Sequence, residues 1–398
     1  MSVPIVFCSH LRYRDVQQRP QRIAQLLATK QPMIYVEEPW WPRGDERRFE
    51  KPPHLAVAYA DHLGSSGDLT VVTPVVPYQE VELPYVTPEN EALARQMVAA
   101  YLSRVGVDQA ILWIYSPMMD GYYGRMVEEL AVVHDKMDEL TGFKGTPPIL
   151  IERERNLIDR ADVMFAGGRT MFESARARHA NCHRFDSGVD FELFLTATLP
   201  ETQVADDLRT LPHPIFGYIG VIDERVDFEA LVALADAYSQ GSVFMGGPVR
   251  KILPGDLPRR SNLIFAYDLD LARNRDPLEA GSIRYTQLSS YIKGFDVCLI
   301  PFSGKTEATK NLSPTKTPEY AAALKPIISG AVPDVVANWG DVIWVAESPE
   351  EYVAAAADIL NGSHADRLAQ AQARASQQTW SSVVSAMLEQ VDHILNRR

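Results

Sequence analysis

The sequence has few cysteines and no long apolar run. Only Cys8, Cys182 and Cys298 occur in 398 residues, and none of them has the close spacing of a zinc-binding pair. We expect three buried thiols without disulfides. No segment approaches the roughly 18 to 20 consecutive apolar residues of a membrane-spanning helix, and the N-terminus lacks the basic start of a signal peptide. These absences predict a cytoplasmic protein.

A basic surplus is also missing, because 52 acidic residues outnumber 39 lysines and arginines and give a net charge of -13. Nucleic acids are bound through their phosphates, so this balance argues against a nucleic-acid partner. Cations are nevertheless concentrated near the N-terminus, at Arg12, Arg14, Arg19, Arg22, Arg43, Arg47, Arg48 and Lys51. Solvated helix faces account for most such charge. The alternative is a patch that faces an anionic substrate or the inner membrane surface, as a peripheral contact.

Short apolar runs rich in β-branched residues alternate with amphipathic segments of helical length along the whole chain. This alternation is typical of βαβ units and parallel sheets, and the length fits two domains. The pattern breaks at the polar, proline-bounded segment 199–212. We therefore predict an α/β fold with two Rossmann-like domains, at 1–198 and 213–375, that face a central cleft. The apolar stripe of residues 376–398 predicts a final helix that packs back on the first domain.

The apolar runs give the expected strands. The first domain should contain strands at 4–9, 33–37, 69–76, 109–115, 131–135, 163–166 and near 183. The second domain should contain strands at 216–220, 243–246, 263–266, 297–301, 326–329 and 342–345. Residues 267–284 show no apolar periodicity, and we predict a surface loop there.

Doubly wound sheets bind ligands beyond the carboxyl ends of their strands, so the candidate residues follow the expected strands. In the second domain, Gly220 and Arg225 follow the first strand, and Gly247 and Lys251 follow the next. Glycine lets the backbone approach a ligand closely, and a cation can bind phosphate. Tight turns with solvated cations explain the same pattern equally well.

A third loop carries more information, because it leads from the strand that ends at Pro301 into a helix. Ser313 and Thr317 each precede a proline that suits the first position of a helix. Unpaired amides at a helix start favour an anion, and Lys316 adds a full positive charge. Glu319 can accept hydrogen bonds from vicinal sugar hydroxyls. The segment predicts recognition of a phosphate and a ribose within one helical turn.

Six segments, taken in order, resemble glycosyltransferase family 4, the retaining GT-B enzymes, and in particular the bacterial subset linked to polysaccharide and teichuronic-acid synthesis. The resemblance covers nearly the whole chain and rests on RPQRIAQLLA, DKMDEL, ERERNLIDRADVMFAGG, SGVDFELF, GYIGVIDERVD and SPTKTPEYAAALKPIIS. It implies transfer of a sugar from a nucleotide-diphosphate sugar to a glycan, a lipid-linked acceptor or a small molecule, with no metal or other cofactor.

The resemblance also implies a donor site in the second domain, where Arg225 and Lys251 would stabilise the leaving diphosphate. The implied donor-binding residues are Gly220, Arg225, Gly247, Lys251, Ser313, Pro314, Thr315, Lys316 and Glu319. Glu319 matches the second glutamate of the family's paired motif, which holds the ribose. The position of the first glutamate is Asn311, so a carboxylate near the reacting sugar would have to come from Glu307.

In the first domain the family places a polar group after a central strand, beside the reacting carbon. The candidates here are His134, Asp135 and Asp138, and the acceptor candidates are His10, Arg12 and Arg19. His134 could instead face the interior, and Asp138 could be a capping acid. Asp268 and Asp270 imitate the metal-binding acids of the other major glycosyltransferase fold. They lie in a domain that already offers cationic phosphate candidates, which argues against a metal.

Two other functions remain open at this stage. A nucleotide-sugar epimerase of GT-B architecture would bind the same donor but needs acid-base groups on both faces of the sugar. A noncatalytic subunit would keep the fold and partner an active transferase. A dehydrogenase is disfavoured because no G-x-G-x-x-G follows the first strand.

Overall fold

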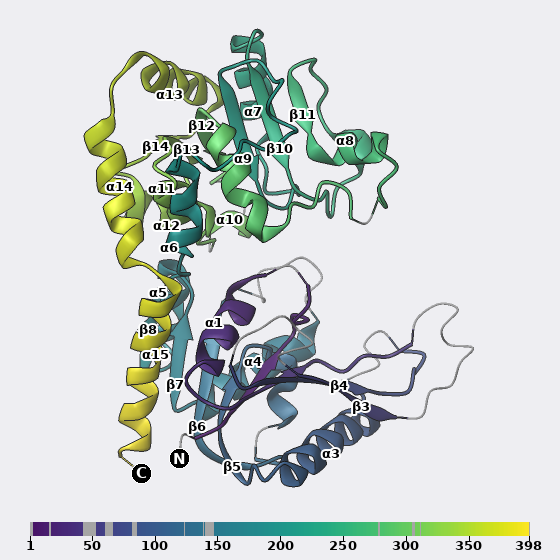
Figure 1. Cartoon of the computed structure of the whole chain (residues 1–398). Coiled ribbons are helices and arrows are strands. Elements are labelled where there is room, and N and C mark those ends of the chain that lie inside the picture. Colours follow the sequence, from purple (N-terminus) through teal and green to yellow (C-terminus); the bar gives the residue numbers. More distant parts are fainter. Residues whose placement is uncertain are drawn as a thin grey trace. The chain divides into compact units, whose positions relative to one another are not determined.

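The computed structural model divides into two units, which are described separately (Figure 1). It describes residues 3–15, 17–42, 53–59, 67–81, 86–122, 124–137, 139, 147–277, 279–304, 307–310 and 312–397. The first unit comprises Met1–Asp186 and Val383–Arg398, and the second comprises Ser187–Ser382. The second unit thus begins before the segment 199–212 at which we placed the domain boundary. The reason is that Val189, Phe194 and Ala197 are buried in the core of the second unit.

The first unit contains an eight-stranded sheet in the order β3-β4-β2-β1-β5-β6-β7-β8. Its strands are β1 (Ile5–Ser9), β2 (Met33–Glu37), β3 (His54–Tyr59), β4 (Leu69–Val75), β5 (Gln109–Ile114), β6 (Glu128–Lys136), β7 (Val163–Ala166) and β8 (Cys182–Arg184). All neighbours pair in parallel except β3, which is antiparallel to β4. The sequence analysis missed β3, an edge strand whose residues are all at least partly exposed and therefore do not form a buried apolar run.

Helices cover both faces of the first sheet, with α1 and α3 on opposite sides (Figure 1). The helices of this unit are α1 (Arg19–Ala28), α3 (Pro88–Arg104), α4 (Pro148–Arg160) and α5 (Arg169–Arg176), with a 3-10 helix, η3, at Pro117–Tyr122. Val6 and Cys8 of β1 pack in one cluster with Ala94 and Val98 of α3. The start of α3 follows the expected chemistry, because the Thr87 side chain accepts a hydrogen bond from the Asn90 amide.

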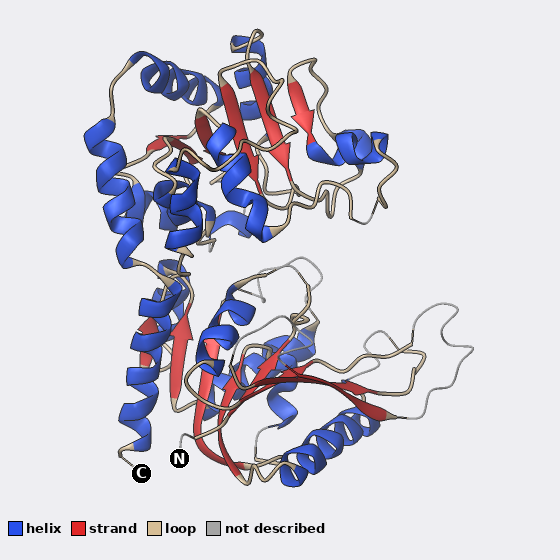
Figure 2. Cartoon of the chain, in the orientation of Figure 1, coloured by secondary structure: helices blue, strands red, loops and turns tan. Residues whose placement is uncertain are grey.

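The second unit contains a six-stranded parallel sheet in the order β11-β10-β9-β12-β13-β14 (Figure 2). Its strands are β9 (Ile215–Ile219), β10 (Ser242–Gly246), β11 (Leu263–Phe265), β12 (Val297–Ile300), β13 (Ile327–Gly330) and β14 (Trp344–Ala346). This is the 3-2-1-4-5-6 order of a Rossmann fold, whose switch point lies between β9 and β12. Each expected strand is present, within about two residues of its predicted ends, because buried parallel strands are continuous apolar runs.

Helices complete the second unit. They are α6 (Phe191–Leu195), α7 (Phe228–Ala237), α8 (Ala266–Ala272), α9 (Leu288–Gly294), α10 (Glu307–Lys310), α11 (Lys316–Ala322), α12 (Pro333–Trp339), α13 (Pro349–Asn361) and α14 (Ala365–Gln377). The last helix, α15 (Trp380–Leu395), begins in this unit and continues into the first. There Val384, Met387 and Val391 are buried, and Lys30 Nζ donates to Ser385 Oγ at 3.2 Å.

The prediction of a surface loop at 267–284 is wrong for its first residues, which form most of α8. Tyr267 and Asp270 are buried, and the Asp270 carboxylate accepts hydrogen bonds from the Gly281 amide at 2.8 Å and from Arg275 at 2.9 Å. Polar contacts therefore anchor this segment, and such contacts leave no apolar periodicity in the sequence. Asp268 instead contacts Arg259.

None of the helices that the structure describes is both long enough and apolar enough to cross a membrane.

Candidate donor and acceptor sites

The loops that follow β9 and β10 pack against each other at the carboxyl edge of the second sheet. The Gly220 amide donates to the Gly246 carbonyl at 2.8 Å, and the Arg250 amide donates to the Ile222 carbonyl at 3.0 Å. A Cβ atom on Gly247 would lie 1.8 Å from the Gly220 oxygen, and its φ of +152° is one that side chains rarely adopt. Gly247 is therefore required for this contact, and two predicted donor loops are brought together.

The start of α11 joins the same edge through Tyr320. Its buried hydroxyl accepts a hydrogen bond from the Ile219 amide at 2.9 Å, at the end of β9. The neighbouring Glu319 is only 6% exposed, and its carboxylate accepts a hydrogen bond from Lys316 Nζ at 2.8 Å. The helix that carries Glu319, the candidate ribose-binding residue, therefore contacts the end of β9, which leads into the loop at Gly220.

Arg225 is oriented by two neighbours. Its guanidinium donates to both carboxylate oxygens of Asp223, with Nε to Oδ1 at 2.8 Å and Nη2 to Oδ2 at 2.7 Å. The same guanidinium lies over the Phe302 ring, 5.3 Å from its centre. A quarter of the Arg225 side chain remains exposed. Arg225 can therefore present one edge to an anion without changing its position.

Lys251 is held less firmly. Its Nζ lies 3.3 Å from Glu224 Oε1, and about half of each side chain is exposed. Exposed ion pairs of this kind contribute about 0 to 1 kcal/mol, so a phosphate could take the place of Glu224 at little cost. Lys251 itself has a φ of +59°, a left-handed conformation that turns the backbone sharply four residues after Gly247.

The helix start expected to bind an anion contributes less than the sequence predicted. α11 has seven residues, and Thr315 at its N-cap makes no side-chain capping hydrogen bond. Ser313, Pro314 and Thr315 are half-buried in the preceding loop. A helix of two turns has a weak dipole, so the charge at this site comes mainly from side chains. Asn311 and the side chain of Glu307 lie outside the described residues.

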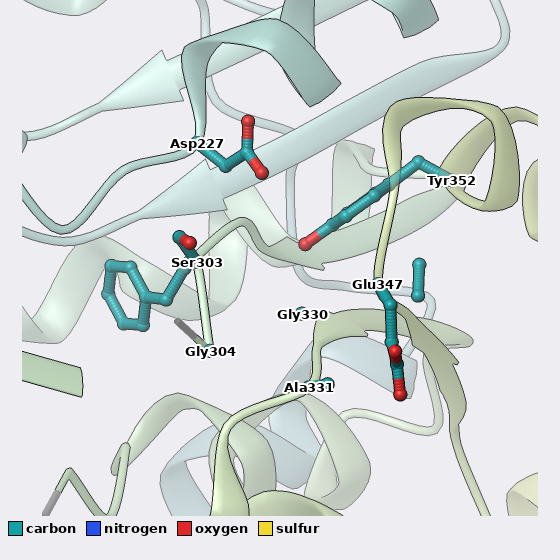
Figure 3. Close-up of a pocket in the computed structure, with 9 residues that line it drawn as sticks. Asp227, Ser303, Gly304, Gly330, Ala331, Glu347 and Tyr352 are labelled. Carbon is teal, nitrogen blue, oxygen red and sulfur yellow. The ribbon is translucent and has the colours of Figure 1, made fainter. Parts of the chain in front are cut away.

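A pocket of about 230 Å³ opens at the carboxyl ends of β12, β13 and β14 (Figure 3). Its polar side chains are Asp227, Ser303, Glu347 and Tyr352. The pocket adjoins the Arg225 loop, because the Asp227 amide donates to the Pro301 carbonyl at 2.7 Å. Carboxylate and hydroxyl oxygens suit sugar hydroxyls better than phosphate. Sequence reasoning missed this pocket, although Glu347 lies two residues after the predicted strand 342–345 and directly follows β14.

In the first unit, Asp135 and Arg19 bind each other in the interior. Arg19 Nη2 lies 3.1 Å from Asp135 Oδ1, the Tyr115 hydroxyl donates to Asp135 Oδ2, and neither charged side chain is more than 3% exposed. Burial raises the pKa of Asp135, while Arg19 and the Tyr115 hydrogen bond act against that rise. These two candidates for catalysis and acceptor binding are therefore used in the packing of the unit. Asp138 lies outside the described residues.

His134 also faces the interior, as the alternative interpretation of the sequence held. It is 1% exposed, and its Nδ1 lies 3.1 Å from the Ile114 carbonyl oxygen. Burial lowers the pKa of His134 to about 4. The ring is therefore neutral near pH 7 and is enclosed by the packing of the unit.

This lowered pKa predicts how stability changes with pH. Below pH 6.5 the unfolded chain binds a proton at His134 while the folded chain does not, so stability falls as the pH falls towards 4. The contribution of this one group is about 3 kcal/mol over that range. We expect His134→Gln to flatten the fall in unfolding free energy measured by urea between pH 6.5 and 4. His393→Gln, at an exposed position, should keep the wild-type dependence of the unfolding free energy on pH. The same dependence in His134→Gln would contradict the lowered pKa of His134.

Arg12 and His10 lie just beyond β1. Arg12 Nη1 contacts Glu37 Oε2 at 3.0 Å and donates to the Glu38 carbonyl at 2.6 Å. Burial lowers the pKa of His10 to about 4, and its Nδ1 is buried without a hydrogen-bond partner among the described residues. No group of three or more histidine, cysteine, aspartate or glutamate residues within the described parts of the chain is arranged to hold a metal ion.

Solved structures share this fold over nearly the whole chain. A sucrose-phosphate synthase from Thermosynechococcus elongatus matches with a TM-score of 0.66 and 16% identity, over 100% of both chains. An E. coli structure described as trehalose-6-phosphate bound with UDP-2-fluoro glucose matches with a TM-score of 0.64 and 11% identity, over 98% of this chain and 99% of the other. An α,α-trehalose-phosphate synthase from Burkholderia xenovorans, in complex with glucose-6-phosphate, matches with a TM-score of 0.63 and 10% identity. The match covers 98% of this chain and 100% of the other.

No family model matches the sequence, and no curated protein matches it in sequence. The structural matches confirm the expected fold class, with two Rossmann-like units of the GT-B type.

Proposed function

We propose that the chain is a glycosyltransferase that moves a sugar from a nucleotide-diphosphate sugar to a hydroxyl of a glycan, lipid-linked or small-molecule acceptor. The second unit would bind the donor, and the first unit would bind the acceptor. The observation that carries the proposal is the convergence of the Gly220, Gly247 and Glu319 segments at one sheet edge, beside Arg225. The similar E. coli structure, which is bound with UDP-2-fluoro glucose, supports a donor of this chemical class.

In this proposal the cations act on the leaving group. The bond between the anomeric carbon and the diphosphate oxygen breaks, the acceptor oxygen bonds to that carbon, and the hydroxyl proton is released. Negative charge grows on the diphosphate as the bond breaks, and Arg225 and Lys251 would stabilise it. Asp223 holds the Arg225 guanidinium in one orientation before the donor arrives, so little reorganisation is needed at this residue.

Glu319 would hold the ribose hydroxyls. In the structure its carboxylate contacts Lys316. A bound phosphate would attract Lys316, so the Glu319 oxygens could accept hydrogen bonds from the ribose instead. The motif resemblance to glycosyltransferase family 4 further supports retention of the anomeric configuration and a role in polysaccharide synthesis as parts of the proposal.

A panel of nucleoside diphosphate sugars tests the proposal, because a ligand that binds only the folded state raises the melting temperature. We expect at least one member to stabilise the protein and to lose its nucleoside diphosphate when an acceptor is added. Epimerised donor in the absence of acceptor would indicate an epimerase. Binding without turnover, relieved by a second protein, would indicate a noncatalytic subunit.

Glu319→Ala is expected to weaken binding of the nucleotide found in that panel. The loss of a charged hydrogen bond costs about 1.5 to 3 kcal/mol, which corresponds to roughly 10- to 150-fold in Kd by isothermal titration. Glu350→Ala, on the exposed first turn of α13, is the matched control and should bind like the wild type. Equal affinity of the Glu319 variant and this control would argue against the ribose assignment.

A further inference from the structure

The first sheet has its own topological switch point, between β1 and β5. β1 lies between β2 and β5, and the register pairs Ser9 with Glu37 on one side and Cys8 with Ile114 on the other. The next backbone bonds continue both ladders, with the Glu38 amide donating to the Ser9 carbonyl at 3.1 Å. Three polar residues therefore stand at one level just beyond neighbouring strands, namely His10, Glu38 and Ser116.

A side-chain hydrogen bond links the two outer members of this triad. The Ser116 hydroxyl donates to Glu38 Oε1, although the two residues are 78 positions apart in the sequence. Ser116 is 2% exposed, while Glu38 is half-buried. The bond joins the end of β2 to the end of β5, on either side of His10, and holds the carboxylate at the switch point.

His10 supplies an unsatisfied group at the same level. Its Nδ1 atom is buried and has no hydrogen-bond partner among the described residues. A buried polar atom without a partner is uncommon, and a hydroxyl group brought to this position would satisfy it. Because burial holds the pKa of His10 at about 4, the imidazole is neutral near pH 7 and can exchange a hydrogen bond with a hydroxyl.

The charges at this edge disfavour a phosphorylated ligand. Among the described residues just beyond these strands, Arg12 contacts Glu37 and Arg19 contacts Asp135. Lys136, at the end of β6, contacts both Glu139 and Glu154. Each of these cations is thus matched by at least one carboxylate, and Glu38 adds a further acid. Near these described residues, a phosphate would therefore meet more negative than positive charge.

We propose that His10, Glu38 and Ser116 bind hydroxyl groups of an uncharged pyranose acceptor. Glu38 accepts a hydrogen bond from the attacking hydroxyl, Ser116 fixes the carboxylate, and His10 binds a neighbouring hydroxyl. The assignment rests on the proposed function and narrows its acceptor class. It also distinguishes this chain from the similar Burkholderia xenovorans enzyme, which was solved in complex with glucose-6-phosphate.

The test uses the full-length protein with two probes, methyl α-D-glucopyranoside and glucose 6-phosphate. Binding is measured by saturation-transfer NMR, and the His10 resonance is assigned in ¹⁵N-histidine spectra by its loss in His10→Gln. We expect the uncharged glucoside to bind at least 10-fold more tightly than the phosphate and to shift the His10 signal. We also expect Glu38→Gln and Ser116→Ala each to weaken glucoside binding at least 10-fold.

Glu128→Gln is the matched control, because Glu128 lies at the opposite, amino-terminal end of β6 in the same sheet. It should bind the glucoside like the wild type, and melting temperatures identify any variant that fails to fold. Tighter binding of the phosphate, absence of glucoside binding, or wild-type glucoside binding by both folded variants would overturn the triad. The panel of nucleoside diphosphate sugars tests donor binding separately. A protein that binds glucoside but no nucleotide would contradict the proposed function and leave the triad as a sugar site.

Discussion

Asp135→Ala is expected to lower the free energy of unfolding by about 3 to 5 kcal/mol, because it leaves the Arg19 charge buried without its carboxylate partner. Both side chains are at most 3% exposed, and Arg19 Nη2 lies 3.1 Å from Asp135 Oδ1. The Tyr115 hydroxyl would lose its acceptor in the same variant. Any loss of activity would then follow the loss of folded protein, and urea unfolding gives the stability directly.

A paired substitution separates the structural role from a chemical one. Replacing a buried ion pair by apolar residues of similar volume is often neutral or stabilising. Arg19→Met combined with Asp135→Leu should therefore regain most of the stability that Asp135→Ala loses. Asp135→Ala could instead keep the wild-type unfolding free energy but lose turnover. In that case the Asp135 carboxylate would act in the reaction, and its assignment to a purely structural role would be wrong.

The strands were predictable because most of them are buried on both faces. β1 and β9 are fully buried along their length, and such strands appear in the sequence as continuous apolar runs. The same burial hid the orientation of His134, since a strand without polar alternation gives no indication of which face a side chain occupies. β3 and α8 were missed for the opposite reason, because exposed residues and polar anchors produce no apolar pattern.

The position of the proposed donor loops was predictable because each loop directly follows a strand. Gly220, Gly247 and Lys251 each follow a strand within a few residues. The rule that ligands bind beyond the carboxyl ends of strands therefore identifies them as candidates. The pairing of Arg19 with Asp135 joins residues 116 positions apart, and no single-sequence pattern indicates it. The same limit applies to Ser116 and Glu38. Sequence periodicity can place residues at a sheet edge, but only the strand order shows which of them meet.

Replacing Arg225 and Lys251 together with alanine is expected to reduce kcat/KM at least 100-fold. Removing a single preorganised donor to developing negative charge costs roughly 100- to 1000-fold in rate, and this variant removes two full charges. Folding should be less affected, since the pair of Lys251 and Glu224 is exposed and the Arg225 side chain is itself a quarter exposed. The measurement is steady-state release of nucleoside diphosphate, compared with the melting temperature of the same sample.

The contact of Arg225 with Asp223 requires one further variant, because Asp223 is 4% exposed and would lose its counter-charge. Asp223→Asn removes that charge, so Asp223→Asn with Arg225→Ala should recover the melting temperature that Arg225→Ala loses. Turnover should stay low in this pair, because the cation that faces the diphosphate is still missing. Recovery of turnover along with stability would mean that Arg225 serves only to neutralise Asp223. In that case the leaving group must be stabilised elsewhere on the chain.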